Sequence, residues 1–252
     1  MPTPEPHFVD RPSPNHDARP AGQRVDILLL HYTDMESAEA ALARLCDPAA
    51  RVSAHYCIDE DGTFYRLVGE DRRAWHAGAS SWAGASNIND RSIGIELVNP
   101  GHSCGYRPFP EAQMTALTVL ATDVLARHPI PPQRVLGHSD VAPLRKKDPG
   151  ELFDWRALAN AGIGLWPEAA EPPEALPETA EIQARLARFG YGVPRHGKFD
   201  EETRAVIAAF QRHFRPAAVT GAPDGETVAL LDALLAQVAP ALRQLDGGAP
   251  EA

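Results

Sequence analysis

The chain has 252 residues, of which 44% are apolar and 23% charged, and its formal net charge is −10. This length allows one large domain with a full core, or a large domain and a small one. No apolar run approaches the roughly 18 residues of a membrane-spanning helix, and no basic stripe is present that would neutralise phosphates. The composition therefore argues against membrane insertion and against nucleic acid as a partner.

The N-terminal segment bears on the compartment. Residues 1–23 are rich in proline and polar side chains and are predicted to form an irregular arm. They contain neither the basic nor the apolar region of a secretory signal, so we expect a cytoplasmic protein, with the periplasm or cell envelope as the alternative. The three cysteines, Cys46, Cys57 and Cys104, form no CxxC pair and are expected to be idle thiols.

The first part of the chain alternates strand and helix patterns. A continuous apolar run over 25–30 predicts a buried strand that leads directly into His31, and residues 36–46 have a helical pattern. Segments 54–59 and 63–68 flank an Asp-Gly turn, which is typical of a β-hairpin.

The alternation continues toward the middle of the chain. Residues 92–98 are rich in β-branched side chains and predict another strand, whereas 110–128 opens with proline and places its apolar residues on one helical stripe. Residues 134–136 read as a short strand before His138, and 155–162 as a closing helix. This order predicts an α/β fold in which helices cover a mixed central β-sheet.

The composition changes after Trp166. Proline and glutamate dominate residues 167–177, a composition typical of a stiff, solvated linker. We therefore divide the chain into a large domain over 24–166, a linker over 167–178 and a small domain over 179–240.

The small domain contains a weak internal repeat. Residues 197–203 resemble residues 221–227, and in each copy an aspartate, Asp200 or Asp224, precedes an apolar helical pattern and is a plausible N-cap. With a further helix starting near Ile182, the pattern predicts a small three-helix domain.

Three residues of the large domain have the chemistry of a metal site. His31 and His138 each follow a predicted strand, and Asp148 lies on the same proline-flanked loop as His138. Taken singly, each has an ordinary structural explanation, as a hydrogen-bonded histidine or a capping carboxylate. Together, two imidazoles and one carboxylate form a catalytic-zinc ligand set, which leaves one position for a water whose pKa zinc would lower to roughly 7.

Two charged residues accompany this set. Glu96 lies within the apolar strand pattern of 92–98, where a carboxylate is costly unless it is paired or has a shifted pKa, although an exposed strand face would also explain it. Lys146 precedes Asp148 by two residues, within reach of a developing oxyanion, although charged loop residues are usually only solvated.

Several linked motifs carry a family resemblance. The chain resembles the type 2 N-acetylmuramoyl-L-alanine amidases, which share their fold with peptidoglycan recognition proteins. The matching motifs are LLLHYT (28–33), VSAHYCIDEDG (52–62), RAWHAG (73–78), NDRSIGIELVNPG (89–101) and GHSDVAPLRKKDPG (137–150).

The resemblance implies specific roles. It places zinc ligands at His31, His138 and Asp148, a catalytic glutamate at Glu96 and an oxyanion-stabilising lysine at Lys146. It implies hydrolysis of the amide between the lactyl group of N-acetylmuramic acid and L-Ala of the stem peptide, with peptidoglycan or muropeptide fragments as partners. We further expect three residues to bind substrate: Trp75, His76 and Asn89.

The C-terminal segment 182–214 resembles a three-helix peptidoglycan-binding module, with a purely structural packing domain as the alternative. For the whole protein, two other functions remain open: a non-catalytic peptidoglycan-binding protein of the same fold, and a zinc peptidase that cuts within the stem peptide. Intact sacculi and soluble 1,6-anhydro muropeptides are both possible substrates.

Overall fold

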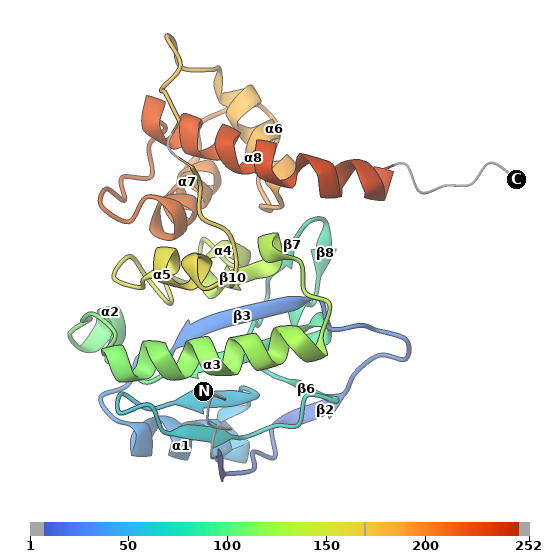
Figure 1. Cartoon of the computed structure of the whole chain (residues 1–252), viewed down its shortest axis with the longest axis vertical. Helices are drawn as coiled ribbons and strands as arrows, with labels where there is room; N and C mark the ends of the chain where they lie inside the picture. Colours follow the sequence, from blue (N-terminus) through green and yellow to red (C-terminus); the bar gives the residue numbers. More distant parts are fainter. Residues whose placement is uncertain (1–7, 169, 247–252) are drawn as a thin grey trace, which may run out of the picture.

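A six-stranded β-sheet forms the centre of the larger part of the molecule. The computed structural model describes residues 8–168 and 170–246 (Figure 1). The strand order is β1-β5-β4-β9-β3-β10, and every neighbouring pair is parallel except the β4–β5 hairpin. The strands are β1 (Phe8–Asp10), β3 (Ile27–Tyr32), β4 (Tyr56–Ile58), β5 (Phe64–Arg66), β9 (Ser92–Leu97) and β10 (Val135–Gly137). The predicted mixed sheet with covering helices is confirmed.

The N-terminal arm is more regular than the sequence predicted. Within the described part of residues 1–23, β1 adds a parallel edge strand next to β5, and β2 (His16–Ala18) pairs with β6 (Arg72–Ala74). Neither segment shows the alternation of apolar and polar residues that indicates a strand. An edge strand forms instead because its backbone pairs with the free N–H and C=O groups of its neighbour. A further two-stranded ladder joins β7 (Ser81–Trp82) to β8 (Ala85–Ser86).

The two faces of the sheet have different chemistry. On β9, Ile93, Ile95 and Leu97 alternate with Ser92, Gly94 and Glu96, so that one face is apolar and the other small or polar. The apolar side chains pack with helix α3 (Glu111–Arg127) in one core. Leu28 and Leu30 of β3 join that core, while Ile27 and Leu29 belong to a second core on the other side. The second face therefore carries the polar residues of the candidate site.

Shorter helices surround the sheet. Ser37 caps α1 (Ala38–Cys46) through its side chain, and Asp154 caps α5 (Trp155–Asn160) in the same way. The remaining elements of this part are α2 (Gly101–Cys104), α4 (His138–Val141) and the 3-10 turns Pro48–Ala50, Ile88–Arg91 and Pro132–Arg134. The segment after β10 was expected to be a loop throughout, but its first residues form the single helical turn α4.

Three helices form the C-terminal part: α6 (Thr179–Phe189), α7 (Glu201–Phe214) and α8 (Gly225–Asp246). The repeat is visible in their hydrogen bonds. Asp200 accepts from the backbone N–H of Thr203, and Asp224 accepts from that of Thr227, so both predicted N-caps are confirmed.

A buried glutamine accompanies each copy of the repeat. Gln183 donates to Thr203 and Gln211 to Thr227. Each capped turn is thereby tied to a preceding helix by a buried amide, which explains why the repeat preserves its threonine.

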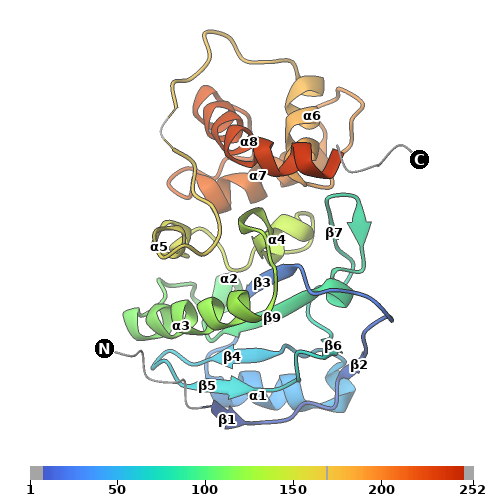
Figure 2. The same ribbon diagram turned by 45° about the vertical axis from the view of Figure 1, so that its right-hand side comes forward.

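The C-terminal helices lie over α4 and α5, beyond the end of the sheet formed by β3 and β10 (Figure 2). Leu136 and Val141 share a core with Phe189, Phe210 and other apolar residues of the three helices. No helix within the described residues is long and apolar enough to cross a membrane. The three cysteines are unpaired, as predicted.

Glu70, in the loop after β5, ties strand β4 to the end of α3. Its carboxylate accepts hydrogen bonds from Tyr56, at 2.7 Å, and from Arg127, and its other oxygen lies 2.7 Å from His128 Nε2. Burial alone would raise the pKa of Glu70, but these three partners outweigh it and lower the pKa to about 2.

Replacing Glu70 should therefore reduce stability in a pH-dependent way. Because the pKa of the folded state lies below that of the unfolded state, the carboxylate stabilises the fold above about pH 4.3 and loses this effect as the pH falls toward 2. We expect Glu70→Gln to lower the free energy of unfolding by about 1–2 kcal/mol at pH 7, with partial solvent exposure allowed for. Urea titrations of metal-free protein at several pH values measure this.

The exposed helical carboxylate Glu39 provides the control, and Glu39→Gln should change stability little at any pH. A stability loss in Glu70→Gln that stays constant between pH 7 and pH 3 would contradict the assigned role of the carboxylate.

Candidate metal centre

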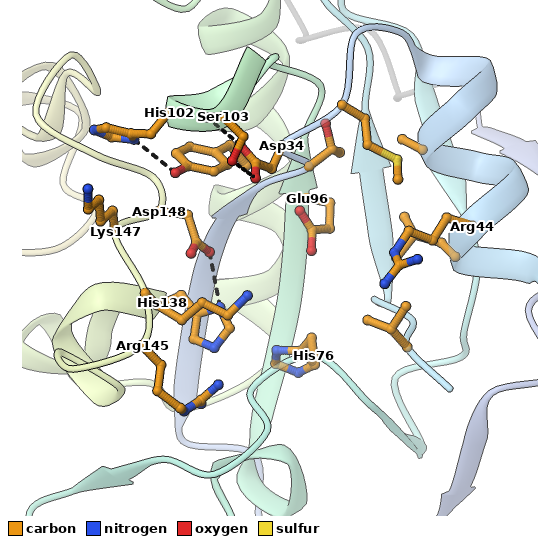
Figure 3. A pocket seen from close by; sticks show the side chains of 17 residues that line it. Asp34, Arg44, His76, Glu96, His102, Ser103, His138, Arg145, Lys147 and Asp148 are labelled. Carbon is orange, nitrogen blue, oxygen red and sulfur yellow. Dashed lines mark hydrogen bonds and ion pairs between the residues drawn. The ribbon is translucent and has the colours of Figure 1, made fainter. Parts of the chain in front are cut away.

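A pocket opens where β3 and β9 end, on the polar face of the sheet (Figure 3). Glu96 lines it, and the parallel register of the two strands pairs Glu96 directly with the buried His31. His138 and Asp148 reach the pocket from α4 and from the loop that follows it. The rim is cationic, with four basic residues contributed by α1 and by that loop: Arg44, Arg145, Lys146 and Lys147.

Three side-chain atoms converge at the floor of this pocket. His31 Nδ1, His138 Nδ1 and Asp148 Oδ2 each lie 3.0 Å from the other two. All three residues are buried, and they form a group whose ligand atoms are close enough to share one metal ion. The structure thus brings together the three residues that the sequence nominated as ligands.

The tautomer of His138 follows from its second nitrogen. His138 Nε2 lies 3.0 Å from the backbone carbonyl of Ala77, and a carbonyl can only accept a hydrogen bond. The proton of a neutral imidazole therefore sits on Nε2, and Nδ1 presents a lone pair to the centre of the site.

His31 is oriented by a longer relay. The hydroxyl of Ser92 donates to the carbonyl of Ile88 at 2.7 Å, so its oxygen is free to accept from His76 Nε2, 3.2 Å away. His76 Nδ1 then accepts from His31 Nε2 at 3.0 Å, which leaves the Nδ1 of His31 without a proton. Gly94 makes room for this relay, because a Cβ there would lie 2.6 Å from the His76 ring.

The hydrogen bonds at the Nε2 atoms of His31 and His138 leave three lone-pair atoms, the two Nδ1 atoms and Asp148 Oδ2, facing one another with no proton between them. Such an arrangement is unfavourable on its own and becomes favourable around a cation. A zinc ion with ligand distances of about 2.0–2.3 Å holds its ligands roughly 3 Å apart, in agreement with the observed triangle. Two neutral imidazoles and one carboxylate suit zinc better than calcium or magnesium, which favour sets of oxygen ligands.

The protonation states of the buried groups agree with this picture. Burial and the neighbouring His138 ring lower the pKa of His31 to about 4. Burial alone would raise the pKa of Asp148, but the two histidines beside it bring that pKa well below its usual range. At neutral pH His31 is therefore a neutral imidazole and Asp148 a carboxylate, the forms in which both residues bind metals.

Glu96 lies next to this group but takes no part in it. Its side chain is buried, and its Oε2 has no hydrogen-bond partner among the described residues. Burial, together with the negative charge of Asp148, raises the pKa of Glu96 well above the usual value. A buried carboxyl group with an unpartnered oxygen at a pocket floor is suited to accepting and returning a proton.

The other predicted residues fall in different places. Lys146 lines the pocket, half-buried, and His76 lines it as well as contacting His31. Trp75 is not among the pocket-lining residues and donates from its indole to Asp17 at 2.7 Å. Asn89, also absent from the lining, accepts from the backbone N–H groups of residues 76 and 77. Substrate binding by Trp75, His76 and Asn89 stays a prediction.

The relay through His76 and Ser92 is not predicted by the sequence patterns. A partial signal existed, since Ser92, Gly94 and Glu96 alternate with bulky apolar residues and so had to share one face of the strand. The position of His76 against that face depends on the loop after β6, which periodicity does not specify.

Comparisons with known proteins agree on one family. The sequence profile described as N-acetylmuramoyl-L-alanine amidase matches residues 21–151, and a peptidoglycan binding domain profile matches residues 176–231. Among curated proteins, N-acetylmuramoyl-L-alanine amidase AmiD of Escherichia coli K12 is 42% identical in an alignment 238 residues long that covers 86% of this chain and 85% of AmiD.

Solved structures give the same result. AmiD in complex with the substrate anhydro-N-acetylmuramic acid-L-Ala-D-gamma-Glu-L-Lys matches with a TM-score of 0.77 at 41% identity, over 87% of this chain and 91% of that one. AMPDH3 of Pseudomonas aeruginosa in complex with anhydromuramic pentapeptide matches with a TM-score of 0.76 at 36% identity, over 86% and 94%.

The relay predicts a measurable effect of His76 on metal binding. Removing the acceptor in His76→Ala frees the His31 ring to change tautomer and rotate, so we expect zinc affinity to fall by about 10–100-fold. Chelator competition measures the dissociation constant. His76→Asn keeps an acceptor oxygen near the position of Nδ1 and should recover part of the loss.

His128→Ala serves as the matched control, because it also deletes a hydrogen-bonded histidine but lies at Glu70, away from the pocket. Zinc affinity equal to wild type in folded His76→Ala would show that the relay does not orient the ligand.

Proposed function

Because this chain belongs to the N-acetylmuramoyl-L-alanine amidase family, we propose that it hydrolyses the amide between the lactyl group of N-acetylmuramic acid and L-Ala of the stem peptide. The single observation that carries the proposal is the buried triangle of His31 Nδ1, His138 Nδ1 and Asp148 Oδ2 beside the unpartnered carboxyl of Glu96. The 1,6-anhydro form of the sugar is included, since AmiD and AMPDH3 were solved with anhydromuramyl peptides.

The metal of this proposal is zinc, held by His31, His138 and Asp148. When bound there, zinc lowers the pKa of a water to roughly 7 and polarises the scissile carbonyl. The residues around it support this chemistry by aiming the Nδ1 atoms of both imidazoles at one point.

Glu96 is the proposed general base. Its raised pKa and its buried position let it take a proton from the attacking water and return that proton to the nitrogen of the departing L-Ala. Without this return the amine would leave as an unstable anion. Neighbouring Ile95 and Leu97 face the α3 core and hold the strand in place.

Lys146 and the cationic rim complete the proposal. In this proposal the Lys146 ammonium, which lines the pocket, stabilises the oxygen that becomes negative during hydrolysis. Arg44 and Lys147, on opposite sides of the pocket in Figure 3, suit the carboxylates of a stem peptide, because a γ-linked D-Glu leaves its α-carboxylate free.

Analysis of the reaction products tests the proposed bond. Zinc-loaded protein should release peptides that begin with L-Ala, together with a peptide-free muramic or anhydromuramic sugar, as identified by chromatography and mass spectrometry. Soluble anhydromuropeptides and intact sacculi should be assayed in parallel to decide between the two substrate forms. Peptides cut within the stem would indicate a peptidase, and release from neither substrate would overturn the proposal.

Replacing the base should separate chemistry from metal binding. Glu96→Gln keeps the size of the side chain but cannot accept the proton, so we expect kcat to fall by about 10²–10⁴-fold while zinc content stays at the wild-type level. Steady-state kinetics and metal analysis of the same preparation measure both quantities.

Glu39→Gln, an exposed change on α1, is the matched control for removal of a carboxylate. If Glu96→Gln retains most of the wild-type kcat, another residue is the base and the assigned role is wrong.

A further inference from the structure

A fully buried carboxylate lies two residues after the proposed ligand His138. Asp140, on the same short helix α4, accepts a hydrogen bond from the backbone N–H of Gly137 at 2.8 Å and so closes the first turn of that helix. The turn has only four residues, too few to be stable by itself. The direction of the His138 side chain depends on what holds this turn in place.

The other partners of Asp140 come from the C-terminal helices. Tyr191, just after α6, donates its hydroxyl to Oδ1 at 2.7 Å, and His213, on α7, places Nδ1 2.7 Å from Oδ2. Both side chains are buried, and burial together with the charge of Asp140 raises the pKa of Tyr191 well above its usual value. The hydroxyl therefore stays protonated and remains a donor.

The surrounding packing fixes these donors. The His213 ring stacks on Trp155 of α5 with centroids 3.7 Å apart, and the Tyr191 ring meets Trp82 edge-on at 4.9 Å. Gly190 packs directly against Trp82, because a Cβ at that position would lie 2.6 Å from the indole. Across this contact, the N–H of Ala83 donates to the Gly190 carbonyl at 2.7 Å.

Backbone contacts of α4 connect the two proposed ligands His138 and Asp148. The N–H of Ser139 donates to the backbone carbonyl of Asp148 at 2.9 Å, so α4 and the second ligand move together. Gly137 packs against Pro149 and Trp155, the residue on which His213 stacks. A displacement of α4 would therefore shift His138 and Asp148 at once.

We propose that the C-terminal helical domain is part of the metal centre, because Tyr191 and His213 clamp Asp140 and thereby position His138. We call these three residues the clamp. Tyr191 and His213 act through Asp140 and the backbone of α4 and are positioning residues. This inference rests on the proposed metal site and gives the C-terminal domain a role besides any binding of peptidoglycan.

The composition of the interface favours this role over simple packing. Apolar contacts such as those of Val141, Phe210 and Phe214 already join the two domains in one core. A buried carboxylate costs several kcal/mol unless it is hydrogen-bonded, so it contributes more to a defined geometry than to the strength of the contact. Asp140 has three donors, two of them from the other domain, and they define one orientation of α4.

Metal binding by variants of the full-length chain tests the clamp. Tyr191→Phe removes one hydroxyl and keeps the ring, and His213→Leu removes the second donor. We expect each to weaken zinc binding by about 10–100-fold in chelator competition, and to change the visible absorption spectrum of the cobalt-substituted protein, which reports ligand geometry. The kcat at limiting zinc should fall while KM stays near the wild-type value.

Two further variants separate positioning from general destabilisation. Thr203→Val removes a buried hydroxyl hydrogen bond of the same domain that does not touch α4, so it should lower the melting temperature without changing zinc affinity or the cobalt spectrum. His213→Asn keeps a donor near the position of Nδ1 and should restore much of the loss. If His213→Leu fails to fold, Tyr191→Phe and His213→Asn still decide the question.

The outcomes distinguish the clamp from the proposed function. Wild-type zinc affinity and an unchanged cobalt spectrum in folded Tyr191→Phe would overturn the clamp and leave the amidase proposal standing, and equal losses in Thr203→Val would overturn it as well. A wild-type chain that binds no zinc would overturn both.

Discussion

The convergence of three lone pairs at one buried point is the constraint on which the rest of this structure depends. His31 Nδ1, His138 Nδ1 and Asp148 Oδ2 lie 3.0 Å from one another, and no proton separates them once the partners of the outer nitrogens are traced. Without a cation this arrangement would repel itself. The sheet, the surrounding hydrogen bonds and the C-terminal helices all help to keep the three atoms in place.

The sheet positions the first of these residues. The register of β3 against β9 puts His31 beside Glu96, and the alternation of β9 turns its small and polar residues to the site while its isoleucines face α3. A shift of register by one residue would turn Glu96 into the apolar core. The outer hydrogen bonds then set the tautomers, through Ala77 for His138 and through His76 and Ser92 for His31.

The C-terminal helices also contact the elements that carry the metal-site residues. Their apolar residues share a core with Leu136 of the edge strand β10 and with Val141 of α4. At the centre of that contact is a buried carboxylate, and its donors, Tyr191 and His213, belong to the other domain. A domain that resembles a peptidoglycan-binding module thus also packs against the short helix that carries His138.

Patterns in the sequence predicted much of this structure, where local chemistry decides. The apolar run before His31, the β-branched strand around Glu96 and the caps Asp200 and Asp224 were all identified, because strand periodicity and capping act over a few residues. The three ligand candidates were nominated from residue type and order along the chain.

Features that depend on long-range contacts were not predictable in this way. The strand β1 exists because β5 offers an edge, and the helical turn at His138 exists because Asp140 caps Gly137 while other elements enclose it. His76 was expected to touch substrate, but its contact with His31 arises from a loop that folds over Gly94. Tyr191 and His213 lie 51 and 73 residues from Asp140, a separation that no periodic pattern connects.

Diffraction from crystals of the zinc-loaded protein, recorded on both sides of the zinc absorption edge, tests directly whether the three converging atoms bind zinc. We expect one anomalous peak, bonded to the Nδ1 atoms of His31 and His138 and to Oδ2 of Asp148, with His31 Nε2 still in contact with His76. A peak bonded to the Nε2 atoms, a peak elsewhere in the molecule, or no peak at all would contradict it.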